Sequence, residues 1–193
     1  MKSVCVFAGS SSGVRPEYAA AAKDLGRTVA GRRISLIYGG ARVGLMGALA
    51  DEALAGGAQV IGVMPESLVA KEVAHRGLTE LRVVKSMHER KAIMSDLAEG
   101  FIALPGGLGT LDETFEILTW AQLGYHSKPV GLLNIEGYFD RLLSFIDHCV
   151  DERFVRREHA NMITVSSSPA ELLDRMGSYK PPVVEKWIER QPV

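Results

Sequence analysis

The sequence predicts an α/β fold in three layers, with a parallel sheet between two layers of helices. Short apolar runs of strand length alternate along the chain with longer segments of helical periodicity. This alternation is typical of a parallel sheet, because each crossover between parallel strands needs a connecting helix. The 193 residues, 47% of them hydrophobic, suffice for one domain with a sizeable core. We expect this domain to span residues 1–177 and a tail to follow at residues 178–193.

Each expected strand is a short run rich in apolar residues. The strands are expected at residues 3–8, 34–38, 59–63, 81–84, 101–104, 129–133 and 162–165. The helices are expected at residues 16–31, in a segment ending near residue 55, and at residues 87–98, 110–123, 138–151 and 169–176. Pro16 suits the first turn of the first helix, and Gly56-Gly57 is a C-terminal signal for the second. Residues 66–80 lack periodicity and are expected to form a loop with room for one short helix.

The charge and cysteine content argue for a cytoplasmic protein that binds neither nucleic acid nor membrane. The 22 basic and 23 acidic residues give a net charge of −1, without the basic excess that nucleic acid or a lipid surface would attract. Cys5 and Cys149 are both expected to be buried free thiols, which fits a reducing compartment. We find no secretory segment and no run of about 18 apolar residues that would span a membrane.

Three glycine-rich turns follow expected strands and point to a binding site. They cover residues 9–13, 39–47 and 106–109. Ligands of parallel α/β sheets bind beyond the carboxyl ends of the strands, where such turns lie. A single turn of this kind often does no more than close a tight connection, but three together predict a nucleotide-sized site. Its candidate binding residues in these turns are Gly9, Ser10, Gly39, Gly40, Gly44, Met46, Gly106, Gly107, Leu108 and Gly109.

The stretch Pro105-Gly106-Gly107-Leu108-Gly109-Thr110-Leu111-Asp112-Glu113 is the strongest of these signals. It joins an apolar strand to a helix, and a glycine turn before a helix N-terminus favours an anion such as phosphate. The carboxylates Asp112 and Glu113 follow at once, which suggests chemistry close to the phosphate, for example at a sugar carbon. Alternatively, Thr110 and Glu113 could form a capping box that serves only the helix.

The segment 87–94 is expected to place a cation in an apolar stripe. At helical spacing Met87, Arg90 and Met94 share one face, with Lys91 at its edge. A buried arginine must pair with or bind an anion, so Arg90 could recognise a phosphate or developing charge. It could equally be a salt-bridged or snorkelling side chain at the border of the stripe.

Other motifs are incomplete. Asp112 stands where a dinucleotide fingerprint needs its third glycine, no phosphate-binding P-loop is present, and Ala92 stands where a zinc-binding His-Glu-x-x-His needs its second histidine. No histidine spacing indicates a metal site. Residues 9–13 do match the Gly-x-Ser-x-Gly pattern of esterases, so Ser11 is a rival candidate for a nucleophile.

Over residues 3–176 the chain resembles the LOG family (LONELY GUY-type cytokinin riboside 5′-monophosphate phosphoribohydrolases), whose older label is "possible lysine decarboxylase". The matching segments are residues 39–47, 87–94, 105–113 and 119–134. The resemblance implies a Rossmann-like fold, usually a homodimer, that cleaves the N-glycosidic bond of a nucleoside 5′-monophosphate. The products would be a purine base and ribose 5-phosphate, with no metal or other cofactor.

The resemblance also implies roles for individual residues. Arg90 and Glu113 fall on the catalytic pair. The implied substrate-binding positions are Glu72, Arg90, Lys91, Thr119 and the span 107–113, which holds Gly107, Leu108, Gly109, Thr110 and Glu113. Asp112 stands where many members have glutamate, a conservative change. A nucleotide-binding carrier or sensor of the same fold is the alternative, and the choice between AMP and an N6-modified adenine nucleotide stays open.

Overall fold

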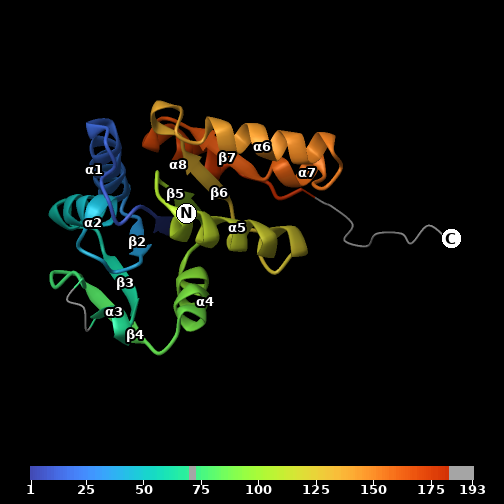
Figure 1. Ribbon diagram of the computed structural model, residues 1–193. Coiled ribbons are helices and arrows are strands. Elements are labelled where there is room, and N and C mark those ends of the chain that lie inside the picture. Colours follow the sequence, from blue (N-terminus) through green and yellow to red (C-terminus); the bar gives the residue numbers. More distant parts are fainter. Residues whose placement is uncertain (70–72, 183–193) are drawn as a thin grey trace.

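The sheet is parallel, and its described strands lie in the order β4-β3-β2-β1-β5-β6-β7. A computed structural model of the chain describes residues 1–69 and 73–182 (Figure 1). The strands are β1 (Ser3–Phe7), β2 (Ser35–Tyr38), β3 (Val60–Pro65), β4 (Glu80–Val84), β5 (Phe101–Ala103), β6 (Val130–Leu133) and β7 (Ile163–Ser166). The helices are α1 (Pro16–Gly31), α2 (Gly44–Ala55), α3 (Glu66–Val69), α4 (Met87–Leu97), α5 (Leu108–Leu123), α6 (Asp140–Asp151), α7 (Arg157–Ala160) and α8 (Pro169–Gly177), with a 3-10 turn η1 (Ile135–Gly137).

The predicted α/β class and all the predicted strands are confirmed, and three helical details differ. Helix α5 begins at Leu108 instead of residue 110, because Gly107 takes the N-cap position. Helix α6 begins at Asp140 instead of residue 138, because Glu136 and Gly137 adopt positive φ angles in η1 and interrupt the helix. Helix α7 was not predicted, since its four residues are too few and too polar to show apolar periodicity.

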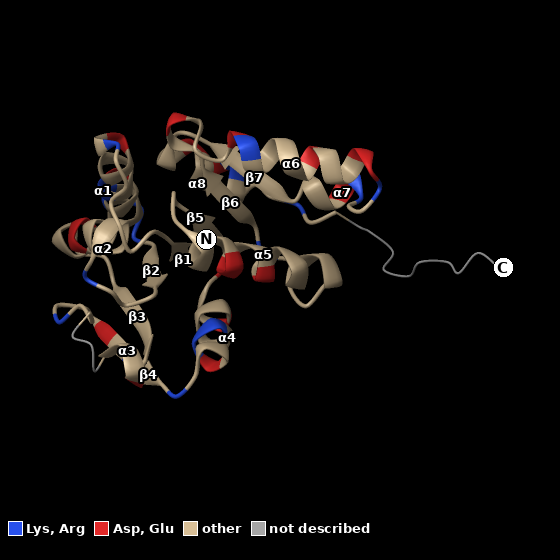
Figure 2. Ribbon diagram, viewed as in Figure 1, with Lys and Arg blue, Asp and Glu red and all other residues tan. Residues whose placement is uncertain are grey.

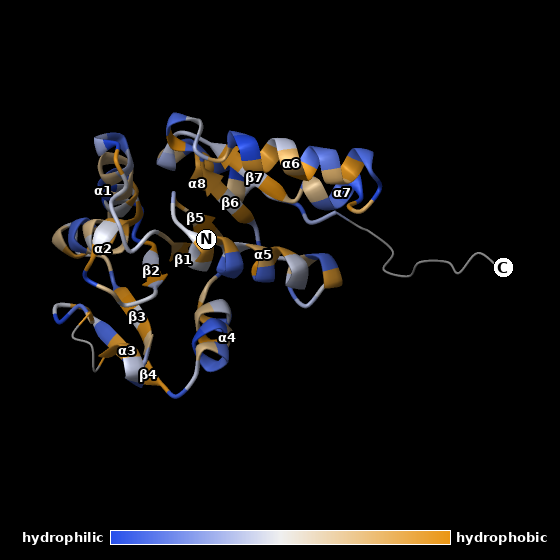
Figure 3. Ribbon diagram, viewed as in Figure 1, coloured by the Kyte–Doolittle hydropathy of each residue, from blue (hydrophilic) through white to orange (hydrophobic). Residues whose placement is uncertain are grey.

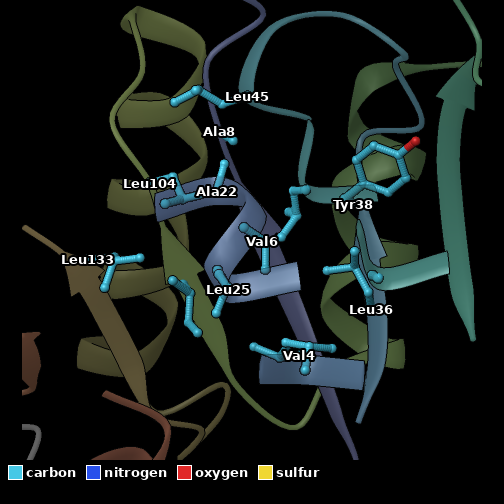
Figure 4. Packing of buried hydrophobic residues seen from close by; sticks show 14 of the residues in the cluster. Val4, Val6, Ala8, Ala22, Leu25, Leu36, Tyr38, Leu45, Leu104 and Leu133 are labelled. Atoms are coloured by element: carbon cyan, nitrogen blue, oxygen red, sulfur yellow. The ribbon is translucent and has the colours of Figure 1, made fainter. Parts of the chain in front are cut away.

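Alternate residues of the central strand face opposite layers. Val4 and Val6 of β1 pack with the buried faces of α1, α2 and α8 (Figure 4). Cys5 and Phe7 point the other way and pack with α4 and α5. The strands are among the most hydrophobic segments of the chain (Figure 3), as expected for strands covered on both faces. Helix α6 extends the second layer, where Leu142 and its neighbours pack beside buried residues of β5 and β6.

The two cysteines are free, but only one is fully buried. Cys5 is 0% exposed at the centre of the sheet, as predicted. Cys149 is partly exposed on α6, so the prediction that it is buried is wrong. Helix α6 has an apolar stripe but no fully buried residue, because it lies at the outer border of its layer. Among the helices of the described part, none is both long and apolar enough to cross a membrane.

Candidate active site

The three glycine-rich turns meet at the centre of the sheet. They follow β2, β1 and β5, which are neighbours in the strand order. Gly9 joins all three turns: its N–H donates to the carbonyl of Pro105 (3.1 Å), and its own carbonyl accepts from the N–H of Leu45 (3.0 Å). The backbone thus fixes the turns relative to one another before any ligand binds.

A cavity of about 300 Å³ lies at this junction. Residues from the turn after β1 and from α2 line it together with residues of α4 and of the start of α5. The lining carries both signs of charge. The lining residues are Ala8, Gly9, Ser10, Met46, Met87, Arg90, Gly107, Leu108, Gly109, Thr110, Asp112 and Glu113. In Figure 2 the acidic stretches of α5 lie beside the basic stretch of α4.

Arg90 is held from several sides. Its Nη2 lies 3.1 Å from Glu113 Oε1, its Nε donates to the carbonyl of Val63 (3.1 Å), and its Nη1 lies 3.8 Å from the sulfur of Met87. The side chain is 11% exposed, so it does not extend into solvent as a snorkelling arginine would. Arg90 is therefore both salt-bridged and part of the cavity wall.

Two glycines make this arrangement possible. A Cβ on Gly39 would lie 2.3 Å from Arg90 Nη2, so the guanidinium occupies the space that a side chain would take. Gly44 has φ +61° and would place a Cβ 2.3 Å from the carbonyl carbon of Ser10, so only glycine lets α2 begin this close to the first turn.

Glu113 is a largely buried carboxylate with a perturbed pKa. Its side chain is 12% exposed. Burial raises the pKa of Glu113, Arg90 and Lys91 oppose this rise, and Asp112 and Glu116 add to it, with the net result that the pKa lies above its ordinary value. A carboxylate that combines burial with a specific cation in a cavity is a candidate for catalysis.

The N-terminus of α5 opens into the same cavity. Gly107 is the N-cap, and Leu108, Gly109 and Thr110 form the first turn, whose N–H groups have no partner within the helix. The capping box between Thr110 and Glu113 does not form, because the helix starts earlier and Glu113 pairs with Arg90 instead. Free N–H groups and the positive end of the helix dipole suit an anion at this position.

A second cavity, of about 270 Å³, adjoins the first and shares Gly9, Ser10 and Gly107 with it. Its wall includes Tyr18 and Tyr138, whose rings meet edge to face at 5.6 Å. The Tyr138 hydroxyl donates to the carbonyl of Gly106 (2.5 Å) and so fixes the turn before α5. Neither tyrosine was predicted from the sequence. For Tyr138 a signal was available, because it follows the carboxyl end of β6, which is the neighbour of β5 in the sheet.

The esterase alternative receives no support from this geometry. The Ser11 hydroxyl accepts a hydrogen bond from the N–H of Gly13 (3.3 Å), and no histidine lines either cavity within the described ranges. Groups of three or more His, Cys, Asp or Glu side chains that could hold a metal ion are also not found in the described part of the chain.

Comparisons with known proteins identify the family. A family model described as "possible lysine decarboxylase" matches residues 46–176. The chain is 48% identical over 180 residues to cytokinin riboside 5′-monophosphate phosphoribohydrolase LOG7 of Arabidopsis thaliana, covering 93% of this chain and 83% of that protein. It is 47% identical over 178 residues to the probable cytokinin riboside 5′-monophosphate phosphoribohydrolase LOGL6 of Oryza sativa subsp. japonica. This match covers 92% of this chain and 71% of that protein. The chain belongs to the LOG family. The predicted resemblance is thereby confirmed.

Solved structures confirm the fold of this LOG-family chain. The molybdenum cofactor binding protein of Rippkaea orientalis superposes with a TM-score of 0.70 at 23% identity, covering 92% of this chain and 97% of that one. The molybdenum cofactor carrier protein of Chlamydomonas reinhardtii gives 0.69 at 19% identity, covering 91% and 96%. At these identities the likeness concerns the fold alone.

The structure brings most of the predicted site residues together. Those that line the main cavity are Gly9, Ser10, Met46, Arg90, Gly107, Leu108, Gly109, Thr110 and Glu113. Gly106 lines the adjoining cavity. Gly39, Gly40 and Gly44 lie behind the wall, where they allow close packing. Asp112, within the predicted span 107–113, lines the cavity as well. Ala8 and Met87 also line it but were not predicted; the position of Met87 on the same helix face as Arg90 was a signal for it.

Two predicted binding positions lie elsewhere, and a third falls outside the described residues. Lys91 is outside the cavity lining and forms ion pairs with α5. Thr119 lines a separate cavity of about 100 Å³ beside α6 and α7, and its hydroxyl donates to the carbonyl of Phe115 (2.7 Å). Glu72 lies outside the described residues.

Proposed function

We propose that this chain hydrolyses the N-glycosidic bond of purine nucleoside 5′-monophosphates, cytokinin riboside 5′-monophosphate among them. The products are the free base and ribose 5-phosphate. The observation that carries this proposal is the largely buried ion pair of Arg90 and Glu113, which lines the same cavity as the N-terminus of α5. The names of the relatives at 47–48% identity describe this reaction.

In this mechanism the phosphate binds at the start of α5. The N–H groups of Leu108, Gly109 and Thr110 and the helix dipole hold it. Binding energy from this remote group then positions the reacting sugar carbon beside Glu113. A nucleoside, which lacks the 5′-phosphate, would not gain this binding energy and should therefore be a poor substrate.

Glu113 acts at the sugar. Cleavage of a glycosidic bond passes through an oxocarbenium-like sugar, which a nearby carboxylate stabilises while it orients water. Water adds its hydroxyl group to C1′, and its remaining proton goes to the departing base. Arg90 fixes the position of Glu113 and contacts the phosphate or ribose; it is not a proton donor, since a guanidinium stays charged well above neutral pH.

A chromatographic assay of base release tests the proposal. Purified protein would be incubated in parallel with AMP, isopentenyladenosine monophosphate, adenosine and lysine. We expect base from the monophosphates and none from adenosine, and loss of turnover in a folded Glu113→Gln variant. Near-normal turnover by folded Glu113→Gln would refute the role of Glu113. Tight nucleotide binding without base release would favour the carrier or sensor alternative, and consumption of lysine would favour the decarboxylase label.

We further propose that the chain forms a cytoplasmic homodimer. The surface of α5 and α6 supports this, because it exposes apolar side chains that a partner copy would cover: Phe115, Leu123, Tyr125, Phe145 and Phe154. The free cysteines fit a reducing compartment. Sedimentation velocity decides the oligomeric state, and a monomer at micromolar concentration would contradict the dimer.

A further inference from the structure

Lys91 follows Arg90 on α4 but serves a different set of carboxylates. Its Nζ lies 2.8 Å from Asp112 Oδ2 and 3.0 Å from Glu116 Oε2. The Lys91 side chain is 14% exposed, so the ammonium is largely shielded from water. Asp112 and Glu116 are four residues apart and lie on one face of α5, which lets a single ammonium bridge them.

The charges around Glu113 are balanced only in part, and Lys91 supplies half of the positive charge. Helix α5 places Asp112 and Glu116 beside Glu113, which makes three carboxylates within two turns. Helix α4 supplies two cations, of which Arg90 pairs with Glu113 and Lys91 with the two flanking acids. Within the described residues, the sheet contributes one titratable group near Glu113, the thiol of Cys5. Burial raises the pKa of this thiol, so the thiol stays neutral.

We propose that Lys91 is a positioning residue: its ammonium neutralises Asp112 and Glu116 and thereby keeps Glu113 ionised and paired with Arg90. This inference rests on the proposed function, because that function gives the ionised form of Glu113 its purpose. It assigns Lys91 an action through Glu113 instead of a contact with substrate, in accord with its position outside the cavity lining.

The directions of the pKa shifts of Glu113 and Lys91 are consistent with this role. Burial raises the pKa of Glu113, Arg90 and then Lys91 lower it, and Asp112 and Glu116 raise it. Burial by itself would lower the pKa of Lys91, but hydrogen bonds to Asp112 and Glu116 raise it above its ordinary value. Lys91 therefore stays charged over the whole range in which Glu113 titrates.

Positioning and direct contact predict different pH behaviour. If Lys91 touched the substrate, removal of its charge would reduce kcat/KM by a similar factor at every pH. If Lys91 acts through Glu113, the loss is greatest at low pH, where Glu113 takes up a proton, and activity recovers as the pH rises.

The test follows the carboxyl carbon of Glu113 by ¹³C NMR during a pH titration of the full chain without substrate. A Glu113→Gln variant identifies the signal. In Lys91→Met we expect the midpoint to rise by about one pH unit, as is usual when an opposite charge at close range is lost. Lys91→Arg and the double variant Lys91→Met/Glu116→Gln should return the midpoint toward that of the original chain. Glu116→Gln alone should lower it, which keeps the test available if Lys91→Met does not fold.

In each variant, the pH at which kcat/KM falls on the acid side should shift by the same amount as the NMR midpoint of Glu113. An unchanged Glu113 titration in folded Lys91→Met, or in Glu116→Gln, would overturn the role of Lys91. So would a loss of activity that is constant across pH. Absence of base release by every form would refute the proposed function, while the NMR titration would still decide whether Lys91 controls Glu113.

Discussion

Replacing Gly39 by alanine is a sharp test of whether the position of Arg90 matters for catalysis. The added Cβ would lie 2.3 Å from Arg90 Nη2, whereas an ordinary contact needs roughly 3.5 Å. The guanidinium must therefore retreat by about 1 Å, which disturbs its 3.1 Å contacts with Glu113 and with the carbonyl of Val63. Gly39 itself has no positive φ, so alanine fits its backbone.

The expected loss is mainly catalytic. A misplacement of about 1 Å at a reacting centre can reduce the rate by about 100-fold, which corresponds to about 2.7 kcal/mol of transition-state stabilisation. The free energy of unfolding should fall by about 1–2 kcal/mol, because the guanidinium is shifted within a largely buried ion pair but its partners stay in place. The assay is kcat/KM for base release from a nucleoside 5′-monophosphate, with the midpoint of thermal unfolding measured in parallel.

Gly31→Ala is the matched control. Gly31 ends α1, and a Cβ added there meets no atom within 4 Å. This variant should keep normal kcat/KM. If Gly39→Ala folds and also keeps normal kcat/KM, then the location of the guanidinium does not limit catalysis. If Gly31→Ala loses as much activity as Gly39→Ala, the loss does not come from Arg90.

Three further outcomes follow from the structure. The pKa of Glu113 is raised, and in the proposed mechanism its ionised form is the active one, so kcat/KM should fall on acidification at a higher pH than for an exposed glutamate. The effect on folding stability runs the other way: the raised pKa favours the folded state at low pH, and this stability is lost as the pH rises through the folded-state pKa. Denaturant titrations of the original chain and of Glu113→Gln would show this difference. Tyr38 is buried, and its hydroxyl has no hydrogen-bond partner within the described residues, so Tyr38→Phe should stabilise the fold by about 1 kcal/mol; a clear fall in the unfolding midpoint would contradict this. Tyr138→Phe removes the hydrogen bond to Gly106 and should raise KM for the monophosphate about 10-fold, and an unchanged KM would show that the turn needs no such support.

The parts of the site that depend on local sequence were predictable. The glycine turns, the strand before residue 105 and the helix after it are encoded within a few residues, and each lies where expected. The parallel sheet then brings the turns to one edge, since strand ends align in any fold of this class.

The parts that depend on distant contacts were not predictable. Whether Arg90 binds an anion or a side chain could not be decided from α4 alone, because its partner Glu113 lies on another helix. The same holds for Lys91, whose position outside the cavity is set by Asp112 and Glu116 of α5. Tyr138 was missed because it reaches the turn at Gly106 across 32 positions of sequence.

Because Cys5 is fully buried, its reactivity toward thiol reagents reports how often the centre of the sheet becomes exposed. Its thiol is fully enclosed beneath α4 and α5, and burial raises its pKa, so a thiol reagent cannot react until the centre of the sheet opens. Cys149, partly exposed on α6, would be labelled at once and calibrates the reagent. The slower labelling of Cys5 that follows would then measure how often β1 becomes accessible, and no engineered probe is needed.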